Sequence, residues 1–210
     1  MRSVVLLGDS ILDNAPYTGP GRDTTTHLGR LLGPGWQVTR LAQDGATMAD
    51  LPLQLARLVA RPDWAILSIG GNDAVAHLGL FDRSVRHATE VLEELLLIGE
   101  DFAIRYRAAL GTVRGVADHL VLCTIYEPPL EPPRLARLAR VPLALLNDWI
   151  IRIGAAHDAA ILDLRSVCTH PEDFVQQIEP SARGAEKIAR AIAALLGHGP
   201  PLRSGNVLAV

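Results

Sequence analysis

The chain has 210 residues, with 20 Lys and Arg against 23 Asp and Glu, which gives a formal net charge of −3. It carries no basic excess that could neutralise nucleic-acid phosphates, and only 4% of its residues are aromatic, which argues against nucleic acid as a partner. The hydrophobic share of 49% excludes a disordered chain. We expect one domain over residues 1–197 and a flexible tail, rich in glycine and proline, over residues 198–210.

Short apolar runs alternate with longer segments of helical periodicity. The apolar runs predict five strands, at residues 3–8, 36–41, 63–70, 119–125 and 159–163. The helical spacing predicts five helices, at residues 24–32, 49–60, 84–117, 136–156 and 182–196. We expect the third helix to be bent or split near Gly99. The alternation predicts a three-layer α/β/α fold with a five-stranded parallel sheet, and a functional site at the carboxyl ends of its strands.

The sequence shows no targeting signal, membrane span or cofactor motif. The apolar run at residues 3–7 is too short for a signal-peptide core, and glutamates interrupt the run at 91–98. We therefore expect a cytoplasmic protein, either a monomer or a homodimer, without a membrane partner. Cys123 and Cys168 form no Cys-x-x-Cys pair, and no cluster of acidic residues and histidines shows metal-ligand spacing. Neither a metal nor a cofactor is expected.

Chemically useful residues follow the first three predicted strands. Asp9 and Ser10 follow the first, and a serine at this point could be a nucleophile whose own backbone N–H faces an oxyanion, or simply a helix cap. Gly45 follows the second strand and could present its N–H to a substrate or permit a turn. Asn72 follows a Gly-Gly pair after the third strand, and could donate its amide into a cleft or belong to the turn.

In combination, these three blocks resemble the SGNH (GDSL) hydrolase family. Gly-Asp-Ser, the later glycine and Gly-Gly-Asn-Asp occur in the family's order, and the resemblance extends over nearly the whole chain. It implies a flavodoxin-like fold and acyl transfer through a serine nucleophile. By position, it implies that Ser10 is the nucleophile and that Ser10, Gly45 and Asn72 form the oxyanion hole. Each such donor contributes roughly 3 kcal/mol to transition-state stabilisation.

The family's last block is altered in this chain. That block is Asp-x-x-His, in which the histidine accepts the serine proton and the aspartate orients the histidine. Alignment on the Pro-Ser pair at residues 180–181 places Glu179 at the position of the histidine and Gln176 at that of the aspartate. The resemblance therefore implies an atypical member, with glutamate where the base is expected.

Three interpretations of this departure stay open. Glu179 accepts the serine proton itself, its pKa raised by burial from a reference value of about 4.3, and it then needs no orienting acid at Gln176. Alternatively, a histidine from elsewhere, His170 or His77, supplies the base. In the third interpretation the protein is catalytically degenerate and binds an ester, acyl or glycan ligand without turnover. We favour the first, because an abandoned site has no need for a full set of oxyanion donors.

Other polar residues are candidates to line the substrate pocket. Asp9, Asp13 and Asn14 surround Ser10 in the sequence, and Asp73 follows Asn72. His77, His170 and Gln176 are further candidates to line it. Asp44 and Asp73 flank the expected oxyanion donors, and their negative charges would disfavour an anionic substrate. No long apolar lid is evident and aromatic residues for stacking on sugars are few, so the expected substrate is a small molecule, a short-chain ester.

Overall fold

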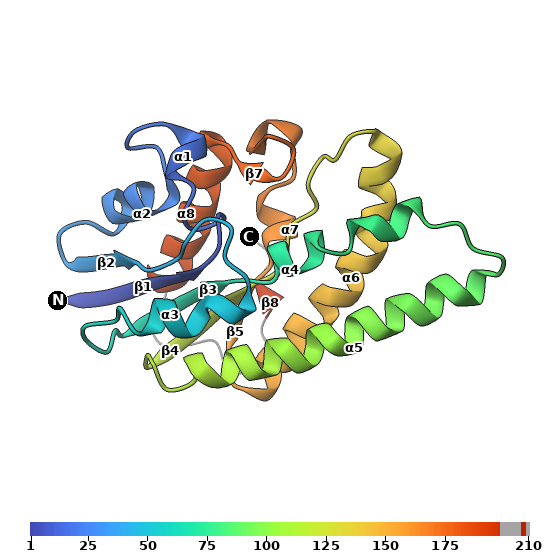
Figure 1. The fold of residues 1–210 in the computed structure, drawn as a ribbon. Helices are drawn as coiled ribbons and strands as arrows, with labels where there is room; N and C mark the ends of the chain where they lie inside the picture. The colour runs from blue at the N-terminus through green and yellow to red at the C-terminus, as the bar shows by residue number, and fades with distance from the viewer. Residues whose placement is uncertain (198–206, 209–210) are drawn as a thin grey trace.

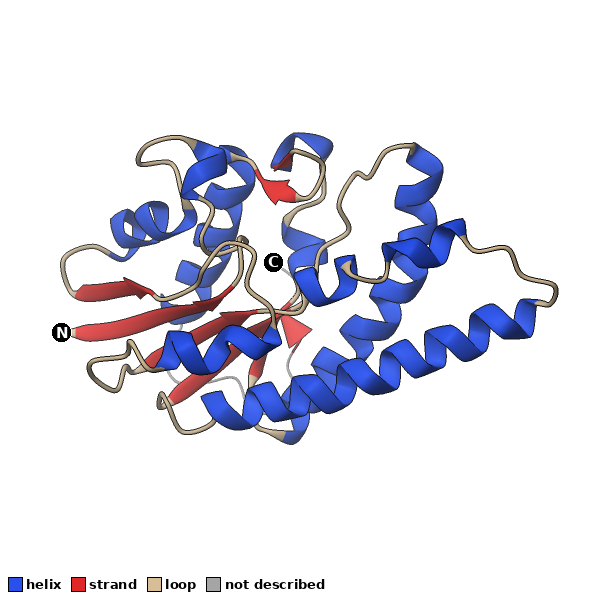
Figure 2. Cartoon of the chain, in the orientation of Figure 1, coloured by secondary structure: helices blue, strands red, loops and turns tan. Residues whose placement is uncertain are grey.

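A parallel β-sheet forms the centre of the structure, a computed structural model that describes residues 1–197 and 207–208. Its strands are β1 (Arg2–Gly8), β2 (Trp36–Arg40), β3 (Trp64–Ser68), β4 (His119–Cys123), β5 (Ala160–Leu162) and β8 (Val207–Leu208). Their spatial order is β2-β1-β3-β4-β5-β8, and every neighbouring pair is parallel (Figure 2). The predicted five-stranded parallel sheet is confirmed, and β8 extends it by one short strand.

The expected flexible tail over residues 198–210 falls on residues outside the described part of the chain, apart from the short strand β8. Val207 and Leu208 of this strand pair with Ile161 and Leu162 of β5. In the described part of the chain, no helix combines the length and the apolar composition that a membrane span requires.

Burial on both faces explains why the central strands have continuous apolar sequences. Successive side chains of a strand point to opposite faces of the sheet. In β1, Val4 and Leu6 therefore pack into one apolar cluster, while Val5 and Leu7 pack into the other. All four side chains are fully buried, as expected of a parallel sheet with helices on both faces.

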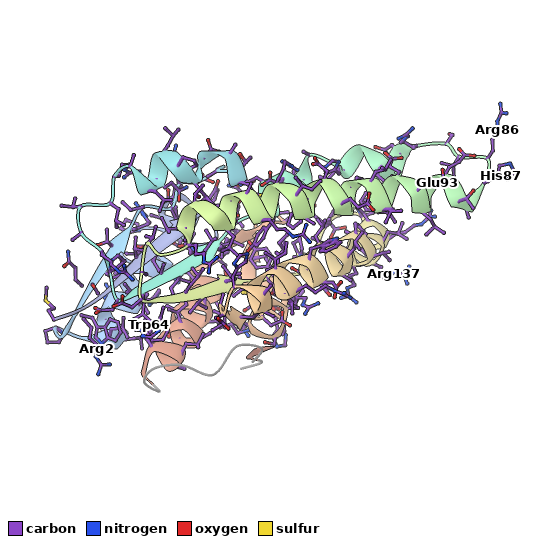
Figure 3. The ribbon with its side chains drawn as sticks, turned by 90° about the horizontal axis from the view of Figure 1, so that it is seen from below. Arg2, Trp64, Arg86, His87, Glu93 and Arg137 are labelled. Atoms are coloured by element: carbon purple, nitrogen blue, oxygen red, sulfur yellow. The ribbon has the colours of Figure 1, made fainter. Side chains whose placement is uncertain are left out.

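Helices cover both faces of the sheet, so the predicted three-layer arrangement is confirmed (Figure 1). On one face, α2 (Thr24–Leu32) and α8 (Ala182–Gly197) pack against each other and against the cluster that contains Val4. On the other face, α5 (Ala88–Val113) and α6 (Pro133–Ala156) pack over Val5 and its neighbours. Figure 3 shows α5 and α6 side by side, with the labelled residues at the start of α5 far from the sheet.

The helix predicted over residues 49–60 is much shorter in the structure. The 3-10 turn η1 (Met48–Asp50) leads into α3 (Leu51–Leu55), and the helix ends there. Leu53 and Val59 are 71% and 99% exposed, so the apolar spacing in this segment does not form a continuous buried face. Without that burial, a helix has little to stabilise its last turns.

The expected bend or split near Gly99 is wrong, because α5 runs from Ala88 to Val113 without interruption. Gly99 gives α6 room to approach: a Cβ at this position would lie 2.9 Å from Cδ2 of Leu145. Close packing of the two helices therefore offsets the low helix propensity of glycine, about 1 kcal/mol.

Short elements at the carboxyl edge of the sheet carry the loops that surround the candidate site. They are α1 (Ala15–Thr18), α4 (Gly71–Val75), the 3-10 turn η2 (Leu78–Asp82), α7 (Leu164–Val167), the 3-10 turn η3 (Pro171–Asp173) and the antiparallel pair β6 (Phe174–Val175) and β7 (Glu179–Pro180). These elements are too short to give a periodic signal in the sequence.

A buried carboxylate joins η3 to α8. The side chain of Asp173 is fully buried and accepts hydrogen bonds from the backbone N–H groups of Thr169 and His170 and from the Lys187 ammonium group. Beside it, Gly184 of α8 lies directly against the backbone of Asp173, because a Cβ there would be 2.1 Å from the Asp173 carbonyl oxygen. This contact fixes the segment that leads into β6 and β7.

We predict that Gly184→Ala destabilises the protein by about 3 kcal/mol or more, because the methyl group would overlap a backbone carbonyl that cannot move independently. The matched control is Gly29→Ala in α2, where no atom lies within 4 Å and alanine should stabilise the helix by about 0.5–1 kcal/mol. Urea unfolding of both variants measures the difference. Equal stabilities would contradict the packing role of Gly184.

Candidate active site

The path of the chain across the sheet creates a crevice at the carboxyl ends of β1 and β3. From β1 the chain moves outward to β2 and then returns to β3 on the other side of β1. Loops that leave two such strands run to opposite faces and leave an opening between them. Ser10 follows β1 and Asn72 follows β3, so both lie at this opening, where α1, α4 and β7 also gather (Figure 1).

A glycine makes the sharp turn that presents Ser10. Gly8 has φ of 122°, and a Cβ at this position would lie 1.7 Å from the carbonyl oxygen of Ser68 in β3. The N–H of Asp9 donates to the same carbonyl oxygen at 3.0 Å. The Gln54 side chain donates to the Gly8 carbonyl at 2.7 Å and accepts from its N–H at 2.8 Å. These contacts fix the turn between the strand end and Ser10.

Each of the three expected oxyanion donors has an N–H hydrogen that is available for a ligand. Within the described residues, the backbone N–H groups of Ser10 and Gly45 donate to no protein acceptor. The Asn72 amide donates one hydrogen to the carbonyl of Ala46 at 2.9 Å, which orients the side chain and leaves its second hydrogen free. Gly45, with φ of 76°, is exposed on the loop next to this bond, whereas Ser10 and Asn72 line the cleft itself.

Glu179 lies next to Ser10 in the same cleft. Its carboxylate is largely buried, and among the described residues its Oε2 atom has no hydrogen-bond partner. Burial raises the pKa of Glu179 above its usual value; the Ser10 hydroxyl, as a hydrogen-bond donor, lowers that pKa, and the negative charge of Asp44 raises it further. The structure thus brings together a serine hydroxyl and a carboxylate that burial makes more basic.

The Tyr126 side chain binds the residue before Glu179 and so holds Glu179 in place, a positioning role that no local sequence signal indicates. Its hydroxyl donates to the carbonyl of Ile178 at 2.6 Å, and its ring packs edge-on against Phe174. The partners are 52 residues apart in the sequence, so no local pattern reveals the contact. Tyr17 adds a polar boundary nearby, since its hydroxyl donates to the Asp44 carboxylate at 2.7 Å.

Asp9 is a second carboxyl group in the cleft, and it is fully enclosed by protein. Its Oδ1 atom accepts the N–H of Ile11 at 3.2 Å. Burial raises the pKa of Asp9 to about 7, and the neighbouring charges of Glu179 and Asp73 add to this effect. Asp9 therefore carries a proton through much of the acidic pH range.

Asp13 and Asn14, which we expected in the substrate pocket, hold loops together instead. Asn14 is fully buried; its amide donates to the Ile11 carbonyl and to the Thr24 hydroxyl, and its oxygen accepts the Thr24 N–H. The Asp13 carboxylate accepts the N–H of Asp44 at 3.0 Å. Polar side chains at helix starts commonly satisfy nearby backbone groups in this way, and neither residue lines the cleft.

The remaining candidates are divided between the cleft and its surroundings. His77 lines the cleft, but His170 is exposed at the start of η3 and lies outside it. Asp73 is also outside: it accepts the N–H of Met48 at 3.1 Å and pairs with Arg105 at 2.7 Å.

Gln176, expected to line the pocket at the aspartate position of the family's last block, lies in the turn between β6 and β7. It has φ of 47° and is exposed, and the next residue, Gln177, also has a positive φ. The turn reverses the chain and brings Glu179 back toward Ser10, so Gln176 contributes to the site through backbone geometry.

A largely apolar cleft extends from Ser10, with a cavity volume of about 130 Å³. It is enclosed by α4, η2, α5, α6 and the loop after β4. Its polar side chains are those of Asp9, Ser10, Asn72, His77, Tyr126 and Glu179. Among the described residues, no group of three or more His, Cys, Asp or Glu side chains could hold a metal ion.

We predict that Asp9→Asn stabilises the protein at alkaline pH. A carboxyl whose pKa is raised from 3.8 to about 7 by folding weakens the fold as pH rises through that interval. Asparagine removes this cost and can still accept the Ile11 N–H. The Tm of the variant should exceed that of the wild type by several degrees at pH 8, with no gain below about pH 4. Asp82→Asn, at an exposed position, is the control; a Tm difference that does not change with pH would contradict the prediction.

Comparisons with known proteins agree with the fold and with the order of its sequence motifs. The sequence profile of the GDSL-like Lipase/Acylhydrolase family matches residues 6–187. Among solved structures, the lipase Lip_vut3 from a goat rumen metagenome has a TM-score of 0.72 at 16% identity, covering 92% of this chain and 97% of that chain. An extracellular lipase from Streptomyces rimosus has a TM-score of 0.70 at 14% identity, covering 92% and 99%.

Axe2, an acetylxylan esterase from Geobacillus stearothermophilus, has a TM-score of 0.63 at 19% identity, covering 92% of this chain and 93% of that chain. At these identities the structural likenesses show a shared fold. A search of curated proteins finds no match. The family profile covers most of the chain, and the fold and the order of its motif-bearing loops agree with it. The chain belongs to the GDSL-like lipase/acylhydrolase family.

Proposed function

We propose that the protein is a serine ester hydrolase that forms an acyl-enzyme on Ser10, with Glu179 as the general base. The observation that carries this proposal is that the Ser10 hydroxyl lies beside the buried Glu179 carboxylate at the end of an apolar cleft. Membership of an acylhydrolase family supports hydrolysis, and so do the lipases and the acetylxylan esterase that share the fold.

The reaction follows from the positions of the groups. Glu179 takes the hydroxyl proton as Oγ of Ser10 attacks the ester carbonyl carbon. The resulting oxyanion accepts hydrogen bonds from the backbone N–H groups of Ser10 and Gly45 and from the Asn72 amide. Glu179 then gives its proton to the leaving alcohol, and the acyl group stays on Ser10. In the second half, Glu179 takes a proton from a water molecule, whose oxygen attacks the acyl carbon. The bond between that carbon and Oγ of Ser10 then breaks, Glu179 returns the proton to Oγ, and the carboxylic acid leaves.

A glutamate can replace the usual histidine because burial raises its pKa. An ordinary glutamate is a weak base, whereas a carboxylate with a raised pKa has a greater tendency to accept the serine proton. A carboxylate also has no tautomer to select, so it needs no second acid, and Gln176 indeed lies away from the cleft. Of the two candidate histidines, His170 lies outside the cleft and His77 lines it. We prefer Glu179 to His77 as the base because the Ser10 hydroxyl acts on the Glu179 carboxylate.

We predict that Ser10→Ala abolishes labelling by a fluorophosphonate probe, and that Glu179→Gln lowers kcat/KM for a p-nitrophenyl ester by about 10²–10⁴-fold. His170→Ala is the control and should retain activity, because His170 is exposed and outside the cleft. Activity that survives Glu179→Gln would overturn the assignment of the base. A wild-type protein that resists labelling at every pH would instead indicate a protein that binds its ligand without turnover.

The pH dependence provides a separate test of the base. Glu179 must be ionised to accept a proton, so kcat/KM should rise with pH through a pKa that lies above the usual glutamate value, and then level off. We predict that this rise depends on the Glu179 carboxylate and is lost from the residual activity of Glu179→Gln, whereas a histidine base would place a rise near pH 6.5 in both proteins. A rise that is centred at or above pH 6.5 and persists in Glu179→Gln would contradict the carboxylate mechanism.

We also predict that Asn72→Ala lowers kcat by about 10²–10³-fold with a smaller change in KM, because the amide bond to the oxyanion strengthens in the transition state. Steady-state kinetics with the same p-nitrophenyl ester measures both constants. Since Asn72 also donates to Ala46, thermal unfolding should accompany the assay to show that the variant is folded. An unchanged kcat in a folded variant would remove Asn72 from the oxyanion hole.

A further inference from the structure

The wall of the cleft is polar next to Ser10 and apolar farther from it. The carboxyl groups of Asp9 and Glu179 and the amide of Asn72 are grouped with Ser10, at the ends of β1, β3 and β7. The rest of the wall is largely apolar and is built mainly from α4, η2 and α6, with Val75, Leu78, Ala139, Leu143 and Leu146 among its side chains. A sugar or another polar group placed there would lose hydrogen bonds to water and find few replacements.

Two apolar side chains on α4 and η2 in this wall are incompletely covered. Val75 is 41% exposed and Leu78 is 38% exposed. On the opposite wall, α6 presents buried Ala139 and Leu146 and half-buried Leu143. An alkyl chain that entered from Ser10 would cover these surfaces and remove them from water, which is the main source of affinity for such a ligand.

The chemistry of the reaction decides which half of the ester occupies this cleft. Glu179 must reach the oxygen of the leaving alcohol to protonate it, so the alcohol lies on the Glu179 side of the reacting carbon. The environment of Glu179 beyond the cleft is polar: the charge of Asp44 acts on it, and Tyr17 binds Asp44. Neither Asp44 nor Tyr17 lines the apolar cleft. A polar alcohol therefore fits beside this pair, and the acyl chain extends between α4, η2 and α6.

We propose that the apolar cleft binds the acyl chain, and that the protein prefers esters of linear medium-chain carboxylic acids to acetyl esters. This inference rests on the proposed ester hydrolysis at Ser10 and specifies its substrate class. It replaces the short-chain ester that the sequence suggested, since the apolar walls come from α4, η2, α5 and α6, which meet only in the folded protein. An acetyl group would leave nearly all of this cleft unused.

The test holds the alcohol constant and varies the acyl chain, with p-nitrophenyl acetate, butyrate, hexanoate and octanoate. Burial of each added methylene should raise kcat/KM by roughly two- to fourfold until the cleft is filled. We therefore expect at least a tenfold preference for octanoate over acetate. A wild-type enzyme that hydrolyses acetate as fast as octanoate, or faster, would overturn the acyl-chain proposal and leave the proposed function intact.

A variant that fills the cleft tests whether the cleft is the source of the acyl-chain preference. Ala139→Phe places a ring in the cavity and should lower the octanoate-to-acetate ratio of kcat/KM at least tenfold. Ala144→Phe, on the exposed side of the same helix and outside the cleft, is the matched control and should keep the wild-type ratio. If Ala139→Phe does not fold, Leu143→Ala enlarges the same cleft and should move the preference toward longer chains. A ratio that none of these changes alters would overturn the proposal.

Binding without turnover separates this inference from the proposed function. The neutral ketone 2-decanone carries a carbonyl group and an alkyl chain but no leaving group. It should bind both the wild type and Ser10→Ala in calorimetry, and bind Ala139→Phe at least tenfold more weakly, while 2-butanone binds none of them measurably. This pattern in a protein without esterase activity would support the apolar-chain site and overturn hydrolysis. Failure of 2-decanone to bind either protein would overturn the acyl-chain site.

Discussion

The proximity of the Ser10 hydroxyl to the buried carboxylate of Glu179 is the feature on which the proposed mechanism depends. A carboxylate with an unpartnered oxygen is costly to bury, and the surrounding structure keeps it there. The Tyr126 hydroxyl binds the residue before it, and the buried Asp173 network fixes the segment before β6 to α8. The fold thus holds a buried carboxylate beside the serine to which we assign the nucleophile's role.

The acidic character of the site has a common cause and a chemical use. The negative charge of Asp44 raises the pKa of Glu179, and that of Glu179 raises the pKa of Asp9. At both Asp9 and Glu179, burial outweighs the hydrogen bonds that favour the ionised carboxylate. Two arginines form ion pairs with other acidic residues of these loops: Arg105 pairs with Asp73, and Arg40 pairs with Asp13. Among the described residues Glu179 has no cationic partner, so its pKa stays raised, which suits a proton acceptor, and the negative charges disfavour an anionic substrate.

The same sheet edge supplies both the reactive groups and the shape of the cleft. The crevice beside β1 brings together loops that run to opposite faces, so residues far apart in the sequence converge on one point. The long helices α5 and α6 pack closely because Gly99 has no side chain, and with α4 and η2 they form the apolar walls beyond that point. The proposed catalytic groups and the apolar cleft proposed for the acyl chain therefore have one architectural origin.

The sequence alone determined the strands along the chain and the three-layer fold, because continuous apolar runs and helical spacing are local signals. The roles of Ser10, Gly45, Asn72 and Glu179 are implied by the family resemblance and stay predictions. Local signals also misplaced Asn14 and Asp13, whose polar groups bind neighbouring loops, and suggested a break at Gly99 that packing against α6 removes. Only the tertiary structure decided the burial of Glu179, its support by Tyr126 and the depth of the apolar cleft. Each of these depends on contacts between segments many residues apart, which no local pattern encodes.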